Sequence, residues 1–259
     1  MKDTTKEKLT AFQEKIRIFP GSTLKWIALI TMIIDHVAAA LLYPCMEAGI
    51  YGPFDYDFWL VVYRIMRNIG RIAFPIYCFL LVEGYHYTRN KWKYLRNLAI
   101  FALVSEVPFD MAFESEVVFW NYQNVFLNLL ISLLTIMTVD WALQKFCKKD
   151  KGLVHDLCWL IPTAIGGVIA LVTFSDYYFF GTILTVILYR FYHNRILQGI
   201  IGYLVFTFEP WCFPSFILLQ MYNGKRGRQY KYFFYAAYPV HLLIIVAIRY
   251  FCFGLGVVL

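Results

Sequence analysis

The chain has 259 residues, of which 60% are hydrophobic, 20% aromatic and only 16% charged, with a formal net charge of +7. A soluble domain of this size cannot bury so many apolar side chains, so the composition indicates a protein whose solvent is the lipid bilayer. No basic run alternates with aromatics on a polar domain, which argues against nucleic-acid binding. The six cysteines form no C-x-x-C pair, so neither a metal site nor a disulfide framework is predicted.

The first 22 residues are polar, but Leu9, Phe12, Ile16 and Phe19 recur at spacings of three and four. This pattern predicts an amphipathic helix over residues 1–22 that lies on the cytoplasmic membrane surface. We expect residues 23–259 to form a single transmembrane domain.

A transmembrane helix needs about 20 mostly apolar residues. The expected fold is all-α, a polytopic transmembrane helix bundle of about nine spans, near residues 24–43, 70–88, 97–113, 124–143, 153–173, 177–193, 196–208, 211–223 and 232–253. Positive charge lies at both the beginning and the end of residues 196–223, so both ends should be cytoplasmic and the chain must cross the membrane an even number of times between them. We therefore expect two short spans, 196–208 and 211–223, that meet near Glu209 on the outer side. Residues 56–68 carry aromatics and arginines, which predicts an interfacial helix on the outer face.

Positive charge sets the expected orientation. Nineteen of the 24 Lys and Arg residues lie in five clusters between apolar stretches, within residues 2–17, 89–96, 145–151, 190–195 and 225–231. Acidic loop residues fall mainly in the alternate gaps. The positive-inside rule then predicts that the N-terminus is cytoplasmic and that the C-terminus lies outside.

Ionisable residues inside spans are costly, so each is a hypothesis for a functional site. In the expected topology, one group of polar residues lies between the membrane midplane and the outer leaflet. These residues are Asp35, His36, Arg71, Glu106, Asp110, Asn124, Asp176 and His241, with Tyr238 one turn before His241. We expect them to share one polar cavity.

Neighbouring residues on a helix point about 100° apart, so Asp35 and His36 cannot both face that cavity. His36 is suited to general-base chemistry near neutrality, while Asp35 could orient an arginine or another helix. Arg71 could instead form a structural ion pair with Glu106 or Asp110. Two function classes remain open from the residues alone: a transferase, and a small proton-coupled transporter or flippase. A transporter often carries an inverted repeat, and none is visible here.

Ten short blocks stand out within the region 24–246: residues 25–28, 32–36, 70–75, 83–85, 87–90, 105–110, 124–127, 176–177 followed by Gly181, 222–227 before Tyr235, and 238–242. In their residues and in their order along the chain, these blocks resemble the TraX family of membrane proteins. The resemblance implies a bacterial, multi-pass protein of the cytoplasmic (inner) membrane. It also implies the activity of the founding member, acetylation of a pilin N-terminus, and kinship with membrane acyltransferases that use acetyl-CoA.

On that resemblance, His36 or His241 would be the general base, and Arg71, Tyr238 or Asn124 would donate to the oxyanion. Asp35 or Asp110 would hold an arginine or the acceptor ammonium. The expected acceptor is a peptide, protein or small-molecule amine or hydroxyl. Cations at the cytoplasmic surface would bind the phosphates of acetyl-CoA, unless they serve topology alone: Arg89, Lys93, Arg96, Lys225, Arg226 and Arg228.

Overall fold

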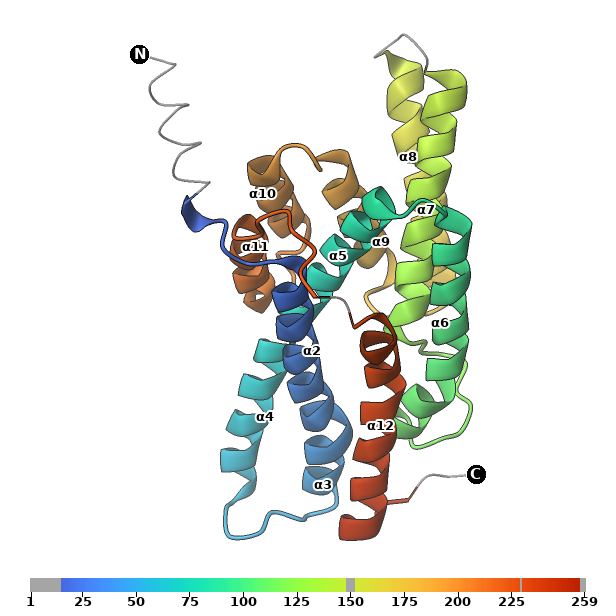
Figure 1. Cartoon of the computed structure of the whole chain (residues 1–259). Coiled ribbons are helices and arrows are strands. Elements are labelled where there is room, and N and C mark those ends of the chain that lie inside the picture. Colours follow the sequence, from blue (N-terminus) through green and yellow to red (C-terminus); the bar gives the residue numbers. More distant parts are fainter. Residues whose placement is uncertain (1–14, 148–151, 229, 257–259) are drawn as a thin grey trace.

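The computed structural model describes residues 15–147, 152–228 and 230–256 (Figure 1). Within these ranges every extended regular element is a helix, and the only β-structure is two isolated bridges, Phe19 with Tyr222 and Gln123 with Ser175. The all-α class predicted from the sequence is therefore confirmed. Most of the expected amphipathic helix, residues 1–14, lies outside the described residues, and residues 17–20 are not helical.

The described elements follow one another along the chain with short connections. The first part contains α2 (Gly21–Val37), the π-helix η1 (Ala38–Leu42), α3 (Tyr43–Glu47), α4 (Tyr56–Gly70), α5 (Ala73–Tyr87) and α6 (Lys91–Phe113). The second part contains α7 (Val125–Phe146), α8 (Leu153–Val172), α9 (Tyr178–Arg190), α10 (Arg195–Val205), the 3₁₀-helix η2 (Pro210–Cys212), α11 (Phe213–Gln220) and α12 (Lys231–Phe253).

Five of these segments are long and apolar enough to cross a membrane: Gly21–Glu47, Tyr56–Tyr87, Val125–Phe146, Leu153–Val172 and Tyr232–Phe253. This finding supports a membrane protein, while the number of nine spans and the orientation stay predictions. The structure does contain the two short helices expected around Glu209, as α10 and α11. They have 11 and 8 residues.

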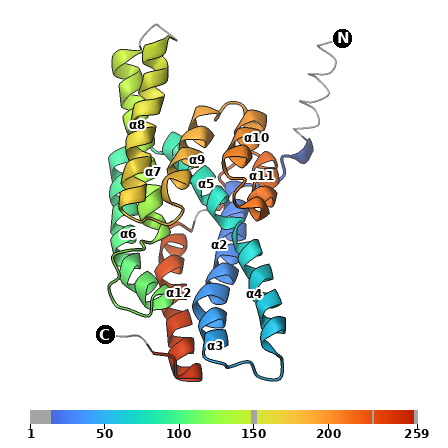
Figure 2. The same cartoon turned by 180° about the vertical axis from the view of Figure 1, so that it is seen from behind.

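The sequence pattern predicted a separate interfacial helix over residues 56–68, and the structure differs. These residues form most of α4, which packs along α2 and continues after a break at Arg71 and Ile72 into α5 (Figures 1 and 2). Asp55 begins α4 by accepting a hydrogen bond from the Phe58 amide at 2.9 Å. Aromatic and charged side chains are also typical of helices at headgroup depth, so those of α4 supported the wrong prediction of an interfacial helix.

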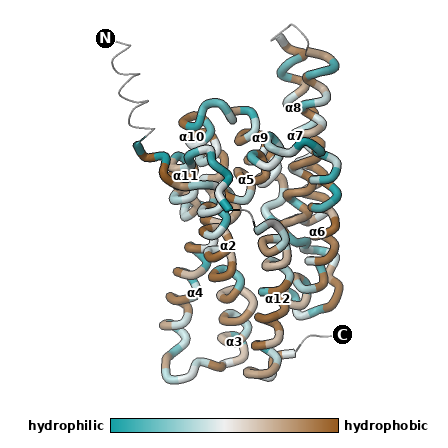
Figure 3. The backbone as a smooth tube through the Cα atoms, in the orientation of Figure 1, coloured by the Kyte–Doolittle hydropathy of each residue, from teal (hydrophilic) through white to brown (hydrophobic). Residues whose placement is uncertain are grey.

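The two ends of the bundle differ in polarity. The connections α5–α6 and α9–α10, which carry basic clusters, lie toward the upper end in Figure 1, whereas α3–α4, α6–α7 and the end of α12 lie toward the opposite end. Figure 3 shows hydrophilic residues gathered near the connections and apolar residues along α12 and α4. This separation agrees with the charge pattern of the sequence.

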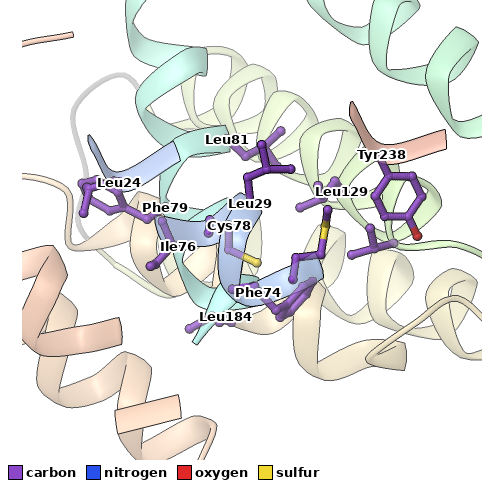
Figure 4. Close-up of a cluster of buried hydrophobic side chains, with 14 of the residues drawn as sticks. Leu24, Leu29, Phe74, Ile76, Cys78, Phe79, Leu81, Leu129, Leu184 and Tyr238 are labelled. Atoms are coloured by element: carbon purple, nitrogen blue, oxygen red, sulfur yellow. The ribbon is translucent and has the colours of Figure 1, made fainter. Parts of the chain in front are cut away.

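The centre of the bundle is α5, which is buried on nearly all sides. Phe74, Ile76, Cys78 and Phe79 pack there against leucines of α2, α7 and α9 (Figure 4). Tyr238 of α12 lies at the edge of this core, where apolar packing gives way to the polar residues described below.

Candidate functional site

Asp35 and His36 leave α2 in different directions, as the helix geometry predicted. The Asp35 carboxylate binds the Arg67 guanidinium of α4, with Oδ2 2.5 Å from Nη1. His36 instead faces α12, where its Nδ1 lies 2.7 Å from Nε2 of His241. The two side chains therefore point in different directions, and of the two partners considered for Asp35, an arginine or another helix, the structure places an arginine beside it.

The two histidines form a directed hydrogen-bond chain. Nδ1 of His241 lies 2.7 Å from the Ala237 carbonyl, which can only accept, so this nitrogen carries a proton in the neutral ring. Nε2 of His241 is then an acceptor, and His36 Nδ1–H donates to it. This assignment leaves the lone pair of His36 on Nε2, where it is available to take a proton.

Aromatic rings hold the histidine pair in place. The rings of His36 and His241 are nearly parallel at 13°, with centroids 4.9 Å apart. Phe113 of α6 and Tyr238 of α12 meet the His36 ring edge-on, at 5.1 and 5.7 Å. Three helices, α2, α6 and α12, thus fix the orientation of the imidazoles.

Arg71, at the break between α4 and α5, pairs with a residue that the sequence did not suggest. Its Nε lies 3.1 Å from Oε2 of Glu209, in the connection between α10 and α11, and its side chain also contacts Tyr177. The predicted partners, Glu106 and Asp110, are wrong. Arg71 lies at the break between α4 and α5, and its side chain points toward the α10–α11 connection.

Glu106 and Asp110 lie on one face of α6, and the amide of Asn124, which caps α7, donates to Glu106 and to the Ala102 carbonyl. Asp110 accepts from the Phe119 amide at 2.9 Å. Each carboxylate keeps a second buried oxygen with no hydrogen-bond partner among the described residues. An uncompensated buried oxygen is costly, which makes these oxygens natural positions for a bound cationic group.

Asp176 follows α8 and accepts a hydrogen bond from the Tyr122 hydroxyl at 3.0 Å. Like Glu106 and Asp110, it forms no salt bridge within the described parts of the chain. Electrostatic interactions link it to Asp35, Arg67 and Arg71. The polar residues of this region therefore include five carboxylates (Asp35, Glu106, Asp110, Asp176 and Glu209) but three guanidinium groups (Arg67, Arg71 and Arg249).

Among the described residues, a cavity of about 590 Å³ reaches the histidine pair only through Tyr238. The other residues expected to share a polar cavity do not line it: Asp35, His36, Arg71, Glu106, Asp110, Asn124, Asp176 and His241. Four cations line it: Lys25 of α2, Arg89 and Lys93 around the start of α6, and Arg226 before α12. No carboxylate is among the described residues of its wall. Tyr238 also lines the cavity, so one side chain borders both the cationic space and the histidine pair.

Three of the six predicted phosphate ligands, Arg89, Lys93 and Arg226, line this cavity, whereas Arg96, Lys225 and Arg228 do not. The loop before α12 is placed by backbone hydrogen bonds to the start of α2, from Gly21 N to Lys225 O at 2.8 Å and from Ser22 N to Arg226 O at 3.0 Å. Lys25 also lines the cavity but was not among the predicted phosphate ligands, because it is an isolated cation outside the basic clusters. Its signal was its place on α2, about three helical turns before His36.

Glu83 is part of the architecture rather than of this region. It binds Arg195 at 2.7 Å and accepts from the Tyr222 hydroxyl at 3.0 Å. These two contacts tie α5 to α10 and to the segment that follows α11. Arg249 was not noticed in the sequence; it is 1% exposed and donates to the carbonyls of Ala40, Met111 and Ala112.

The chain is similar to known proteins over most of its length. The family model described as TraX protein matches residues 20–249. A curated relative from Dichelobacter nodosus, named probable fimbrial assembly protein FimC, serogroup H1, is 27% identical over 266 residues, which cover 90% of this chain and 97% of that protein. No solved structure matches the chain. The chain belongs to the TraX family.

Proposed function

We propose that this protein is an acyltransferase of the bacterial inner membrane that moves an acetyl group from cytosolic acetyl-CoA to an acceptor amine. The observation that carries the proposal is the cavity with four cations whose wall includes Tyr238, next to the His36–His241 pair. It unites an anion-binding space with a general base, as transfer from an anionic thioester requires.

The cavity fits the donor in charge and in size. Lys25, Arg89, Lys93 and Arg226 would hold its phosphates through charge-assisted hydrogen bonds. The volume of about 590 Å³ lies within the range of ligand pockets, about 300 to 1,000 Å³. Acetyl-CoA, when bound, supplies an acetyl group that its thioester makes reactive toward an amine.

His36 acts as the base in this scheme. The bound ammonium first gives one proton to a neighbouring carboxylate, such as Glu106 or Asp110, and the neutral amine then attacks the thioester carbon. Nε2 of His36 takes the second proton as the carbon–nitrogen bond forms and the carbon–sulfur bond breaks, with CoA leaving as the thiolate. His241 accepts the Nδ1 hydrogen of His36, which fixes the tautomer and stabilises the imidazolium that forms. Tyr238 lies beside both rings, where its hydroxyl can donate to the developing oxyanion.

The charge around His36 favours an amine over a hydroxyl acceptor. Glu106, Asp110 and Asp176 lack cationic partners in salt bridges within the described chain, and a protonated amine would supply the missing positive charge. Because a curated relative is named a probable fimbrial assembly protein, the acceptor we propose is a peptide amine of a fimbrial subunit.

The proposal is tested with purified protein in detergent. We expect acetyl-CoA, but not free acetate, to raise the melting temperature, because a ligand that binds only the folded state stabilises it. We also expect CoA release when a peptide with a free amine is added. His36→Ala should reduce transfer by about 100-fold or more while the melting shift persists. His193→Ala, which changes an exposed histidine outside the site, serves as the control.

No melting shift at millimolar acetyl-CoA, with no CoA release, would overturn the acyltransferase proposal and favour the transporter alternative. Full transfer by a folded His36→Ala variant would overturn the role of His36.

A further inference from the structure

We propose that Lys25 binds a phosphate of the acyl donor and that the length of α2 between Lys25 and His36 selects donors of matching length. This inference rests on the proposed function. It adds a binding residue and a specificity rule, which is that a thioester at a set distance from an anionic group is used more efficiently than one without such a group.

The geometry of α2 sets the distance between the phosphate-binding Lys25 and the base His36. Lys25 and His36 are 11 positions apart within Gly21–Val37, and the π-helix begins only at Ala38. At about 100° per residue, 11 residues return to the same helix face within about 20°, and at about 1.5 Å per residue they span about 16 Å. Met32, at an intermediate position on this face, also lines the cavity.

The opposite wall of the cavity is formed by α12, where a second set of side chains also lies along one helix face. Phe234, Tyr238 and His241 lie at intervals of four and three residues and therefore share one face. The two faces meet at both ends: Nζ of Lys25 lies 5.8 Å from the centre of the Phe234 ring, and His36 binds His241. The seam between α2 and α12 thus has a cation at one end and a base at the other.

The residues between these two ends carry no charge. Met32, Leu81 and Tyr77 line this stretch of the cavity, so they offer contacts for a neutral, flexible arm but no second place for a phosphate. CoA has its diphosphate and its thioester at opposite ends of such an arm. A short thioester without phosphates can meet the base, but it cannot also meet Lys25.

The test compares two donors, acetyl-CoA and the short thioester S-acetyl-N-acetylcysteamine, with a peptide amine as acceptor. For Lys25→Gln we expect kcat/KM with acetyl-CoA to fall about 10- to 100-fold, which corresponds to one charge-assisted hydrogen bond. With the short thioester, kcat/KM should stay within about twofold of the unsubstituted protein. Lys25→Arg should recover most of the loss. Lys145→Gln, outside the cavity, is the matched control.

An equal loss with both donors would overturn the inference, since it would show a general effect on the fold or the base. No loss with either donor would overturn it as well. If the unsubstituted protein transfers acetyl from neither donor, the proposed function itself fails, and this inference with it; transfer with an unchanged Lys25→Gln profile rejects the role of Lys25 alone.

Discussion

The ion pair between Asp35 and Arg67 should behave as a mutually dependent unit. Their side chains are 15% and 24% exposed, and the second Asp35 oxygen is buried without a hydrogen-bond partner in the described chain. Arg67→Gln would therefore leave the carboxylate without its main counter-charge. Breaking a fully buried pair costs about 3 to 5 kcal/mol, and the partial exposure here lowers our expected cost to about 2 to 3 kcal/mol.

A double-mutant cycle measures this dependence. Removing both charges, in Asp35→Asn with Arg67→Gln, should cost less than the sum of the single changes by about 1 to 3 kcal/mol. The free energy of unfolding can be followed by tryptophan fluorescence during titration of mixed micelles with SDS. Arg64→Gln, an exposed arginine one turn earlier in α4, is the control and should change little. Additive effects, or an Arg67→Gln cost equal to that of Arg64→Gln, would refute the reasoning.

Three further predictions concern the packing around the site. Glu83→Gln should lower the free energy of unfolding by about 3 kcal/mol, because it removes the counter-charge of the half-buried Arg195 from another helix; an unchanged SDS midpoint would contradict this. Gly70→Ala would place a methyl group on the Asp35 carboxylate and should lower the melting temperature, whereas Gly152→Ala, in open space, should not. Arg249→Met should lower the free energy of unfolding by about 3 kcal/mol, since three backbone carbonyls lose a charged donor; a melting temperature equal to that of the unsubstituted protein would contradict this.

Local helix geometry made part of the site predictable. The angle of about 100° between neighbouring residues was enough to separate the roles of Asp35 and His36. The expected topology placed His36 and His241 at a similar depth but did not predict that they contact each other; in the structure Nδ1 of His36 lies 2.7 Å from Nε2 of His241. These inferences needed only the helix period and the order of the charged loops.

Pairings between distant segments could not be predicted in the same way. Arg71 binds Glu209, and that contact depends on the break after Gly70 and on the short α10–α11 pair, neither of which a hydropathy pattern resolves. The same limit affected α4. Its arginines looked like headgroup ligands, but Arg67 is neutralised by Asp35 of α2, so the segment can pack along that helix.

Charge distribution connects the two proposals. Arg89, Lys93 and Arg226 belong to the basic clusters at one end of the bundle, as the positive-inside rule predicts, and Lys25 lies near the start of α2 at the same end. All four line one cavity, and no carboxylate is among the described residues of its wall.

On the other side of Tyr238, carboxylates outnumber guanidinium groups. A protein that bound only an anion would need only the excess of cations in the cavity, and one that bound only a cation would need only the excess of carboxylates. An anionic donor and a cationic acceptor that meet at His36 would compensate both, which is why we favour acyl transfer to an amine over proton relay in a transporter.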